Sequence, residues 1–136
     1  MPAPATWSAQ TQWPPEPRHV GDARRFVAEQ LVATDLDHLV DTVGLIVSEL
    51  ATNAVRHAHS PFRVSLARAE DQLLLVVRDE SSAPALLGEG DASAVGGRGL
   101  QLVSTLSHAW GVTPHAGDGK SVWARFDIVE AEMLSV

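Results

Sequence analysis

The stretch DLDHLVDTVGLIVSELATNAVRHA, residues 35–58, carries the strongest periodic pattern in the chain. At about 100° per residue, its apolar side chains fall on one broad arc of a helix. The residues of this arc are Val43, Ile46, Val47, Leu50, Ala51 and Ala54. The pattern predicts a long helix that packs on a core and stops before Pro61, because proline disfavours helical backbone in the residue before it.

The opposite side of this helix carries an unusual polar set. Glu49, Thr52, Asn53 and Arg56 lie within about 100° of one another on the helical wheel. They can be the ordinary polar face of a surface helix. Asparagine, however, is a weak helix former that competes for backbone hydrogen bonds, so its place inside a long helix calls for a reason. The helix alone leaves both interpretations open.

The rest of the chain alternates between period-two and helical patterns. A loose alternation before three prolines predicts an edge strand, and the segment 80–97 has loop composition. We expect residues 1–5 to be disordered. The further predicted elements are strands at 6–13, 62–69, 73–79, 110–116 and 121–129, and helices at 18–34 and 99–109. This order predicts an α/β fold with a mixed or antiparallel sheet covered by helices.

Length and composition exclude several kinds of protein. The 136 residues suit one domain, and a net charge of -7 argues against binding a nucleic-acid backbone through a basic surface. The absence of cysteine excludes disulfides and thiolate chemistry. No apolar run is long enough for a membrane helix, and the first residues do not resemble a secretory signal. We therefore expect a cytoplasmic, single-domain protein.

Several apparent motifs fail on their spacing. Gly119-Lys120-Ser121 resembles the end of a P-loop, but Pro114 stands where the motif needs glycine. Gly97-Arg98-Gly99 lacks the third glycine of a dinucleotide fingerprint. His57 and His59 are two residues apart, so on a helix they would not face one metal.

Two further segments can carry chemistry. Asp79 follows the apolar strand LLLVVRD, where a carboxylate can accept a hydrogen bond from a ligand amine or simply begin a turn. The cluster GGRGLQLV, residues 96–103, leads glycines into a helix whose first N–H groups can hold phosphate. It can equally be a flexible connection.

Taken in chain order, these segments resemble the GHKL superfamily of ATP-binding domains, and most closely its anti-sigma-factor serine/threonine kinases. ELATNAVRHA is similar to the N box, VVRDESSAP to the first glycine box, GGRGLQLV to the second and GKSVWARF to the closing strand. The resemblance covers about residues 5–129 and implies a two-layer α/β sandwich of the Bergerat type. In that fold a mixed, mostly antiparallel sheet is covered by three helices.

The resemblance also implies roles for individual residues, with ATP and Mg²⁺ as the cofactors. Asn53 would bind Mg²⁺, Glu49 would be the catalytic base, and Asp79 would accept from the adenine amine with support from Ser121. Residues 80–97 would form the ATP lid. The residues implied to contact phosphates are Arg56, Gly97, Arg98, Gly99 and Leu100. The first glycine box departs from the family pattern, because Glu80-Ser81-Ser82 follows Asp79 without a glycine.

The implied function is a partner-switching regulator. It would bind a sigma factor and phosphorylate an anti-sigma-factor antagonist of the STAS type, without direct contact with nucleic acid or membrane. A homodimer that uses Trp7 and Trp13 stays open. The alternatives are an ATP-gated binding module without kinase activity and, less favoured, a detached ATP-binding domain of a histidine kinase.

Overall fold

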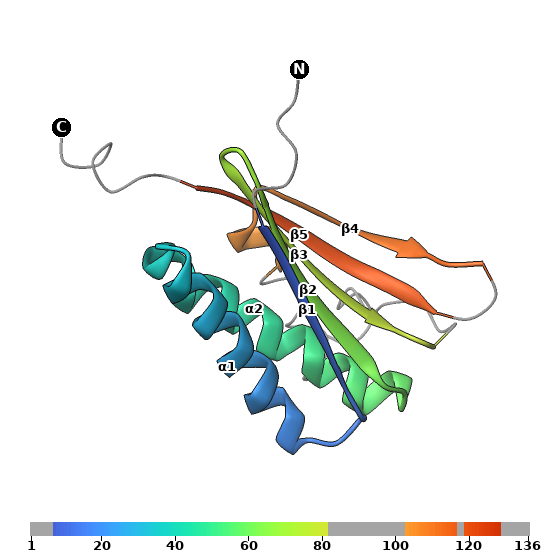
Figure 1. The fold of residues 1–136 in the computed structure, drawn as a ribbon. Coiled ribbons are helices and arrows are strands. Elements are labelled where there is room, and N and C mark those ends of the chain that lie inside the picture. Colours follow the sequence, from blue (N-terminus) through green and yellow to red (C-terminus); the bar gives the residue numbers. More distant parts are fainter. Residues whose placement is uncertain (1–6, 82–102, 117–118, 129–136) are drawn as a thin grey trace, which may run out of the picture.

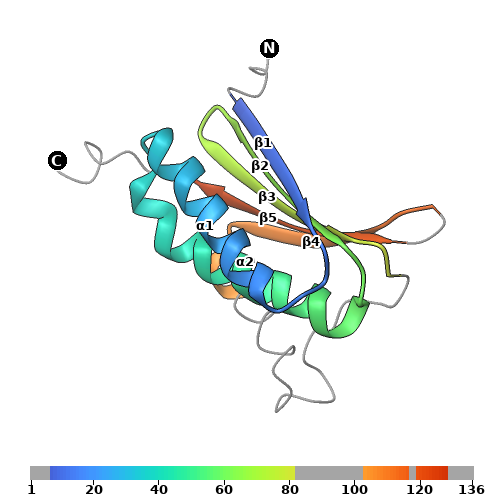
Figure 2. The ribbon, with the colours of Figure 1, turned by 60° about the horizontal axis from the view of Figure 1, so that its bottom comes forward.

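The computed structural model describes residues 7–81, 103–116 and 119–128. Within these residues, five strands form one sheet with the order β1-β2-β3-β5-β4, and every neighbouring pair is antiparallel. The strands are β1 (Trp7–Trp13), β2 (Phe62–Ala69), β3 (Gln72–Asp79), β4 (Ala109–Pro114) and β5 (Lys120–Asp127). The helices α1 (Arg18–Ala33) and α2 (Val40–Asn53) cover one face of the sheet (Figures 1 and 2). Residues 103–106 add a further helical turn.

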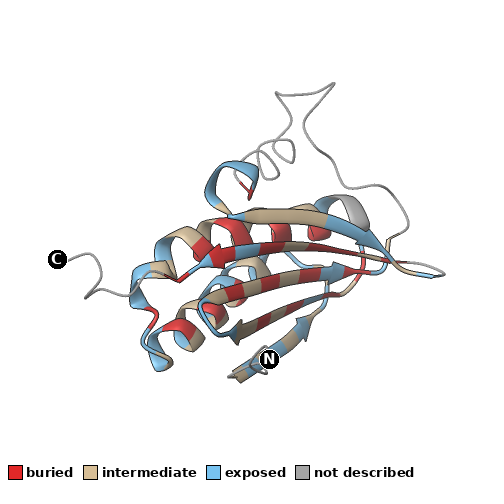
Figure 3. Cartoon of the chain, turned by 90° about the horizontal axis from the view of Figure 1, so that it is seen from above, coloured by how far each residue is buried: buried red, intermediate tan, exposed pale blue. Residues whose placement is uncertain are grey.

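The core lies between the helices and the sheet. Buried side chains alternate along the central strands and repeat at helical spacing on α1 and α2, as Figure 3 shows. On β3 the residues of the helix-facing side are Leu73, Leu75, Val77 and Asp79. Asp79 therefore continues an apolar row with a carboxylate at the end of the strand. The α/β two-layer sandwich that the sequence predicts is confirmed.

The N-terminal strand is anchored by aromatic packing. The ring centroid of Trp13 lies 6.1 Å from that of Phe26 on α1 and 5.6 Å from that of Phe62 on β2. The predicted edge strand is thus confirmed, with β1 paired to β2 alone.

The long helix predicted at 35–58 is divided into three parts, which corrects the prediction. A short 3₁₀ turn at Asp37–Leu39 precedes α2, and a π-helical turn at Ala54–Ala58 follows it. A regular helix cannot begin at residue 35, because Asp35 has a positive φ of 63°, outside the right-handed helical region. The next residue, Leu36, is fully buried in the core. The π turn ends at His59, which is left-handed and donates its N–H to the Ala54 carbonyl oxygen at 3.1 Å.

One other expectation changes in the C-terminal part. The helix predicted at 99–109 ends earlier, since Ala109 already begins β4 and the His108 N–H donates to the Arg125 carbonyl oxygen at 2.7 Å. The described sheet is wholly antiparallel, in agreement with the predicted mixed or antiparallel sheet. Among the helices that the structure describes, none is long and apolar enough to cross a membrane.

Candidate functional site

Two polar segments meet at one end of the sandwich. The C-terminal end of α2 leads through the π turn into β2, whose first residue, Phe62, lies directly opposite Asp79 at the end of β3. The hydroxyl oxygen of the buried Ser60 accepts a hydrogen bond of 2.9 Å from the N–H of Glu80. This bond ties the end of the helix connection to the residue that follows Asp79. Figure 1 shows the ends of α2 and β3 at the same end of the sandwich.

Asn53 is the last residue of α2, immediately before the π turn. Its side-chain oxygen Oδ1 is buried, and it has no hydrogen-bond partner among the residues that the structure describes. A buried acceptor left unsatisfied costs about 1 to 3 kcal/mol. π-helical turns are rare and are often found at functional sites. The amide oxygen is therefore available to a ligand at the point where the helix changes its hydrogen bonding.

The other polar residues near the C-terminal end of α2 and in the π turn divide into two groups. Ser48 and Thr52 donate their hydroxyls to backbone oxygens one turn earlier, of Gly44 at 2.9 Å and of Ser48 at 2.7 Å. Arg24 of α1 also donates to the Ser48 hydroxyl, at 3.3 Å, so this flank faces α1. In contrast, Glu49 and Arg56 make no hydrogen bond or ion pair within the described ranges 7–81, 103–116 and 119–128. Glu49 is half-buried and Arg56 is exposed.

Asp79 is a buried carboxylate, with 6% of the residue exposed. Its oxygen Oδ1 accepts two hydrogen bonds, from the Ser81 N–H at 2.9 Å and from the Lys120 ammonium at 3.1 Å. The side chain of Asp79 is buried, with 8% of it exposed, and that of Lys120 is mostly buried, with 11% exposed. Within the described part of the chain, the second oxygen Oδ2 accepts no hydrogen bond. The carboxylate is thus held in place with one acceptor left over.

Lys120 is a site residue that the sequence-based prediction missed. It lies directly opposite Asp79 in the antiparallel pairing of β5 with β3, so the two side chains share the helix-facing side of the sheet. Lys120 is also the only lysine of the chain, which is a signal that the sequence does contain. The partner could not be read from it, because the two residues are 41 positions apart and their register is set by the sheet.

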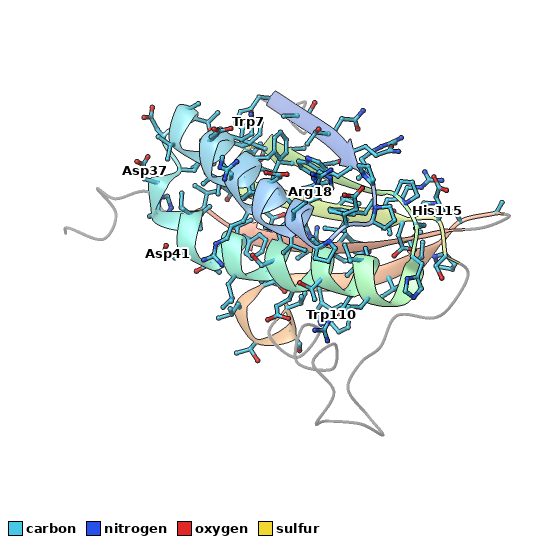
Figure 4. All side chains as sticks on the ribbon, turned by 90° about the horizontal axis from the view of Figure 1, so that it is seen from below. Trp7, Arg18, Asp37, Asp41, Trp110 and His115 are labelled. Carbon is cyan, nitrogen blue, oxygen red and sulfur yellow. The ribbon has the colours of Figure 1, made fainter. Side chains whose placement is uncertain are left out.

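Ser121 lies on the other face of the sheet, so the structure does not bring it to Asp79 as predicted. It pairs with Arg78 and Thr113, and its hydroxyl forms a 2.7 Å hydrogen bond with Nε2 of His115. Ser121 lines an open groove of about 490 Å³ on this outer face, together with Thr113, His115 and Trp123. Figure 4 labels His115 at the end of the sheet where β4 turns toward β5. Successive residues of a strand point to opposite faces, and this alternation gives the place beside Asp79 to Lys120.

The comparison with protein families agrees with this geometry. The family model of the histidine kinase-like ATPase domain matches residues 13–126, which is most of the chain. The chain belongs to the histidine kinase-like ATPase domain family. No curated protein sequence matches it. The matched span includes Glu49, Asn53, Asp79 and Lys120.

Membership identifies this chain as an ATPase domain of the GHKL type and implies ATP as its ligand, ordinarily with Mg²⁺. The residues at the site fit such a ligand. Mg²⁺ prefers oxygen ligands and keeps several waters, so one unsatisfied amide oxygen on Asn53 is a suitable protein contribution. The Oδ2 of Asp79, which accepts no hydrogen bond from the described residues, can accept one from an exocyclic amine.

Several predicted contacts of the ATPase domain lie outside the described residues. These are the phosphate contacts at Gly97, Arg98, Gly99 and Leu100, and the part of the predicted lid from residue 82 to 97. Glu80 and Ser81, at the start of that segment, are described and are joined to Ser60 and Asp79 by hydrogen bonds.

Gly119 sets the approach of β5 to β3 at the site. Its φ is +115°, and a Cβ built on it would lie 2.8 Å from the backbone oxygen of Asp79. Gly119→Ala is expected to lower the free energy of unfolding by about 2 kcal/mol or more, since both the backbone conformation and the contact with main-chain atoms are unfavourable.

Urea unfolding would measure the effect of Gly119→Ala. The matched control is Gly21→Ala on α1, where the added Cβ meets nothing within 4 Å and helix propensity should raise the free energy of unfolding by about 1 kcal/mol. Equal effects of the two substitutions would show that the close approach at Gly119 is unimportant.

Proposed function

We propose that this ATPase domain is a partner-switching regulator of the cytoplasm. In this proposal it is an anti-sigma factor that binds a sigma factor and uses ATP to phosphorylate a serine or threonine of an anti-sigma-factor antagonist of the STAS type. The observation that carries the proposal is the side-chain oxygen Oδ1 of Asn53, which lies one turn from the carboxylate of Glu49 and at the same end of the fold as Asp79. Neither the Asn53 oxygen nor the Glu49 carboxylate has a partner among the residues that the structure describes. An amide for the metal and a carboxylate for the proton are the two groups that phosphoryl transfer to a hydroxyl needs nearby.

Asp79, Asn53 and Glu49 have different roles in the proposed phosphoryl transfer. Asp79 orients the base through its free Oδ2, and Asn53 offers its amide oxygen to Mg²⁺, which when bound supplies charge neutralisation on the phosphates. Glu49 accepts the proton of the antagonist's hydroxyl as that oxygen bonds to the γ-phosphorus. The bond from the γ-phosphorus to the bridging oxygen breaks at the same time, so ADP leaves with the electron pair.

The charge of Arg56 also favours binding of a nucleoside triphosphate at this site. The protein carries a net charge of -7, so a triphosphate needs local cations to approach it. Arg56 lies on the turn after Asn53, is exposed, and has no acidic partner within the described residues. It is therefore suited to offset phosphate charge without first breaking an ion pair.

The test combines nucleotide binding with transfer to a purified antagonist. ATP with Mg²⁺ at about 100 times its dissociation constant should stabilise the folded protein by roughly 2.7 kcal/mol, seen as a rise in melting temperature. Labelled ATP should then yield a phosphoserine or phosphothreonine on a STAS-type antagonist. Binding without transfer to any antagonist would favour the ATP-gated binding module instead. No change in melting temperature with ATP, ADP or GTP in the presence of Mg²⁺ would contradict the nucleotide site itself.

A further inference from the structure

The buried pair of Asp79 and Lys120 presents two unlike hydrogen-bonding groups side by side. Asp79 holds Lys120 through Oδ1 alone, and its Oδ2 remains an acceptor in the described structure. An ammonium group has three N–H donors. One of them is used by Asp79, and no other acceptor for Lys120 lies within the described residues. The pair therefore offers an acceptor and a charged donor at one place.

We propose that Lys120 is a base-reading residue that donates directly to ring nitrogen N1 of adenine while Asp79 accepts from the 6-amino group. This inference rests on the proposed nucleotide site and assigns a second specificity residue to it. Along its hydrogen-bonding edge, adenine presents a donor at N6 next to an acceptor at N1. The pair supplies the complementary order, an acceptor from Asp79 and a donor from Lys120.

The burial of the pair makes the recognition strong. A hydrogen bond from a charged donor is stronger than one between neutral groups, and a low local dielectric strengthens it further. The side chain of Lys120 is 11% exposed, and the close approach of Gly119 to the Asp79 backbone holds the two strand ends together. Lys120 is thus placed by the sheet and does not have to be recruited by the nucleotide.

The ion pair with Lys120 also explains how the charged carboxylate of Asp79 can be buried before a nucleotide binds. A buried carboxylate alone is costly, whereas one that is paired and hydrogen-bonded is tolerated. When adenine binds, the Oδ1 contact with Lys120 can persist, because the base uses Oδ2 and a different N–H of the lysine. Recognition by this pair therefore adds hydrogen bonds to the base and keeps the bond between Asp79 and Lys120.

Calorimetry with two nucleotides tests the inference on the unmodified protein. The nucleotides are ATP and 1-deaza-ATP, in which a C–H group replaces N1, each with Mg²⁺. We expect the wild-type protein to bind ATP roughly 10- to 100-fold more tightly than 1-deaza-ATP. Equal binding of the two by wild type would overturn the role of Lys120 and leave the nucleotide site intact. Binding of neither would overturn the proposed function, and this inference with it.

Variants give a second, independent readout. Lys120→Met should bind ATP and 1-deaza-ATP equally, within about twofold, whereas Lys120→Arg, which keeps a charged donor, should still prefer ATP. The matched control is Arg125→Met, which removes a positive charge from the other face of the same strand, where the guanidinium lies 5.7 Å from the Trp123 ring centroid. It should keep the wild-type preference.

Two results from these measurements would contradict the assignment. Tighter ATP binding by Lys120→Met than by wild type would show that Lys120 blocks the base site. Tighter binding of GTP than of ATP by wild type would show that the pair reads an edge with the donor and acceptor reversed. If Lys120→Met does not fold by circular dichroism, the comparison of nucleotides on the wild-type protein decides alone.

Discussion

Asn53→Ala is expected to abolish the rise in melting temperature caused by ATP and Mg²⁺, and to leave the ligand-free protein as stable as wild type or more stable. Ligand stabilisation of roughly 2.7 kcal/mol at 100 times the dissociation constant would be lost, because the amide oxygen that serves the metal is gone. The ligand-free protein should gain about 1 kcal/mol, since the substitution removes an unsatisfied buried acceptor and places a better helix former in α2. Thermal unfolding with and without nucleotide would measure both effects.

The control for Asn53→Ala is its neighbour on α2. Thr52→Ala removes only the hydrogen bond from the Thr52 hydroxyl to the Ser48 carbonyl oxygen, so the shift with ATP and Mg²⁺ should remain. A purely structural asparagine would behave differently. Asn53→Ala would then lower the stability of the ligand-free protein, and the remaining shift with ATP and Mg²⁺ would match that of Thr52→Ala.

Glu49→Gln is expected to reduce phosphoryl transfer to the antagonist by about 10²- to 10⁴-fold, the range typical of a lost general base. The change is isosteric, and Glu49 has no hydrogen bond to lose within the described residues, so the free energy of unfolding should stay within about 0.5 kcal/mol of wild type. The affinity for ATP should be unchanged or slightly higher, because one negative charge near the triphosphate is removed. Single-turnover transfer assays and calorimetry would separate the two quantities.

The matched control for Glu49→Gln is Glu29→Gln on the exposed side of α1, where the same charge is removed away from the site. It should leave both transfer and ATP affinity at wild-type values. An undiminished transfer rate in Glu49→Gln would assign the base to another group. A large loss of ATP affinity in Glu49→Gln would instead show that Glu49 serves binding.

Much of the fold could be predicted because its elements carry strong local patterns. Val43, Val47 and Leu50 repeat at helical spacing, and Leu73, Leu75 and Val77 alternate with period two, so α2 and β3 are visible in the sequence. Element ends were less predictable. The π turn after Asn53 and the early start of β4 at Ala109 depend on hydrogen bonds to other parts of the chain or on backbone geometry that no single residue type specifies.

For the candidate site, the sequence by itself singled out Glu49, Asn53 and Asp79, because their spacing within a helix and at a strand end is local. Only the tertiary structure decided which residue lies beside Asp79. Ser121 and Lys120 are adjacent in sequence, yet the register of β3 with β5 places them on opposite faces of the sheet. A shift of one residue in that register would exchange their sides. The register is set by the packing of the whole core, so the Asp79–Lys120 pair could be read only from the folded chain.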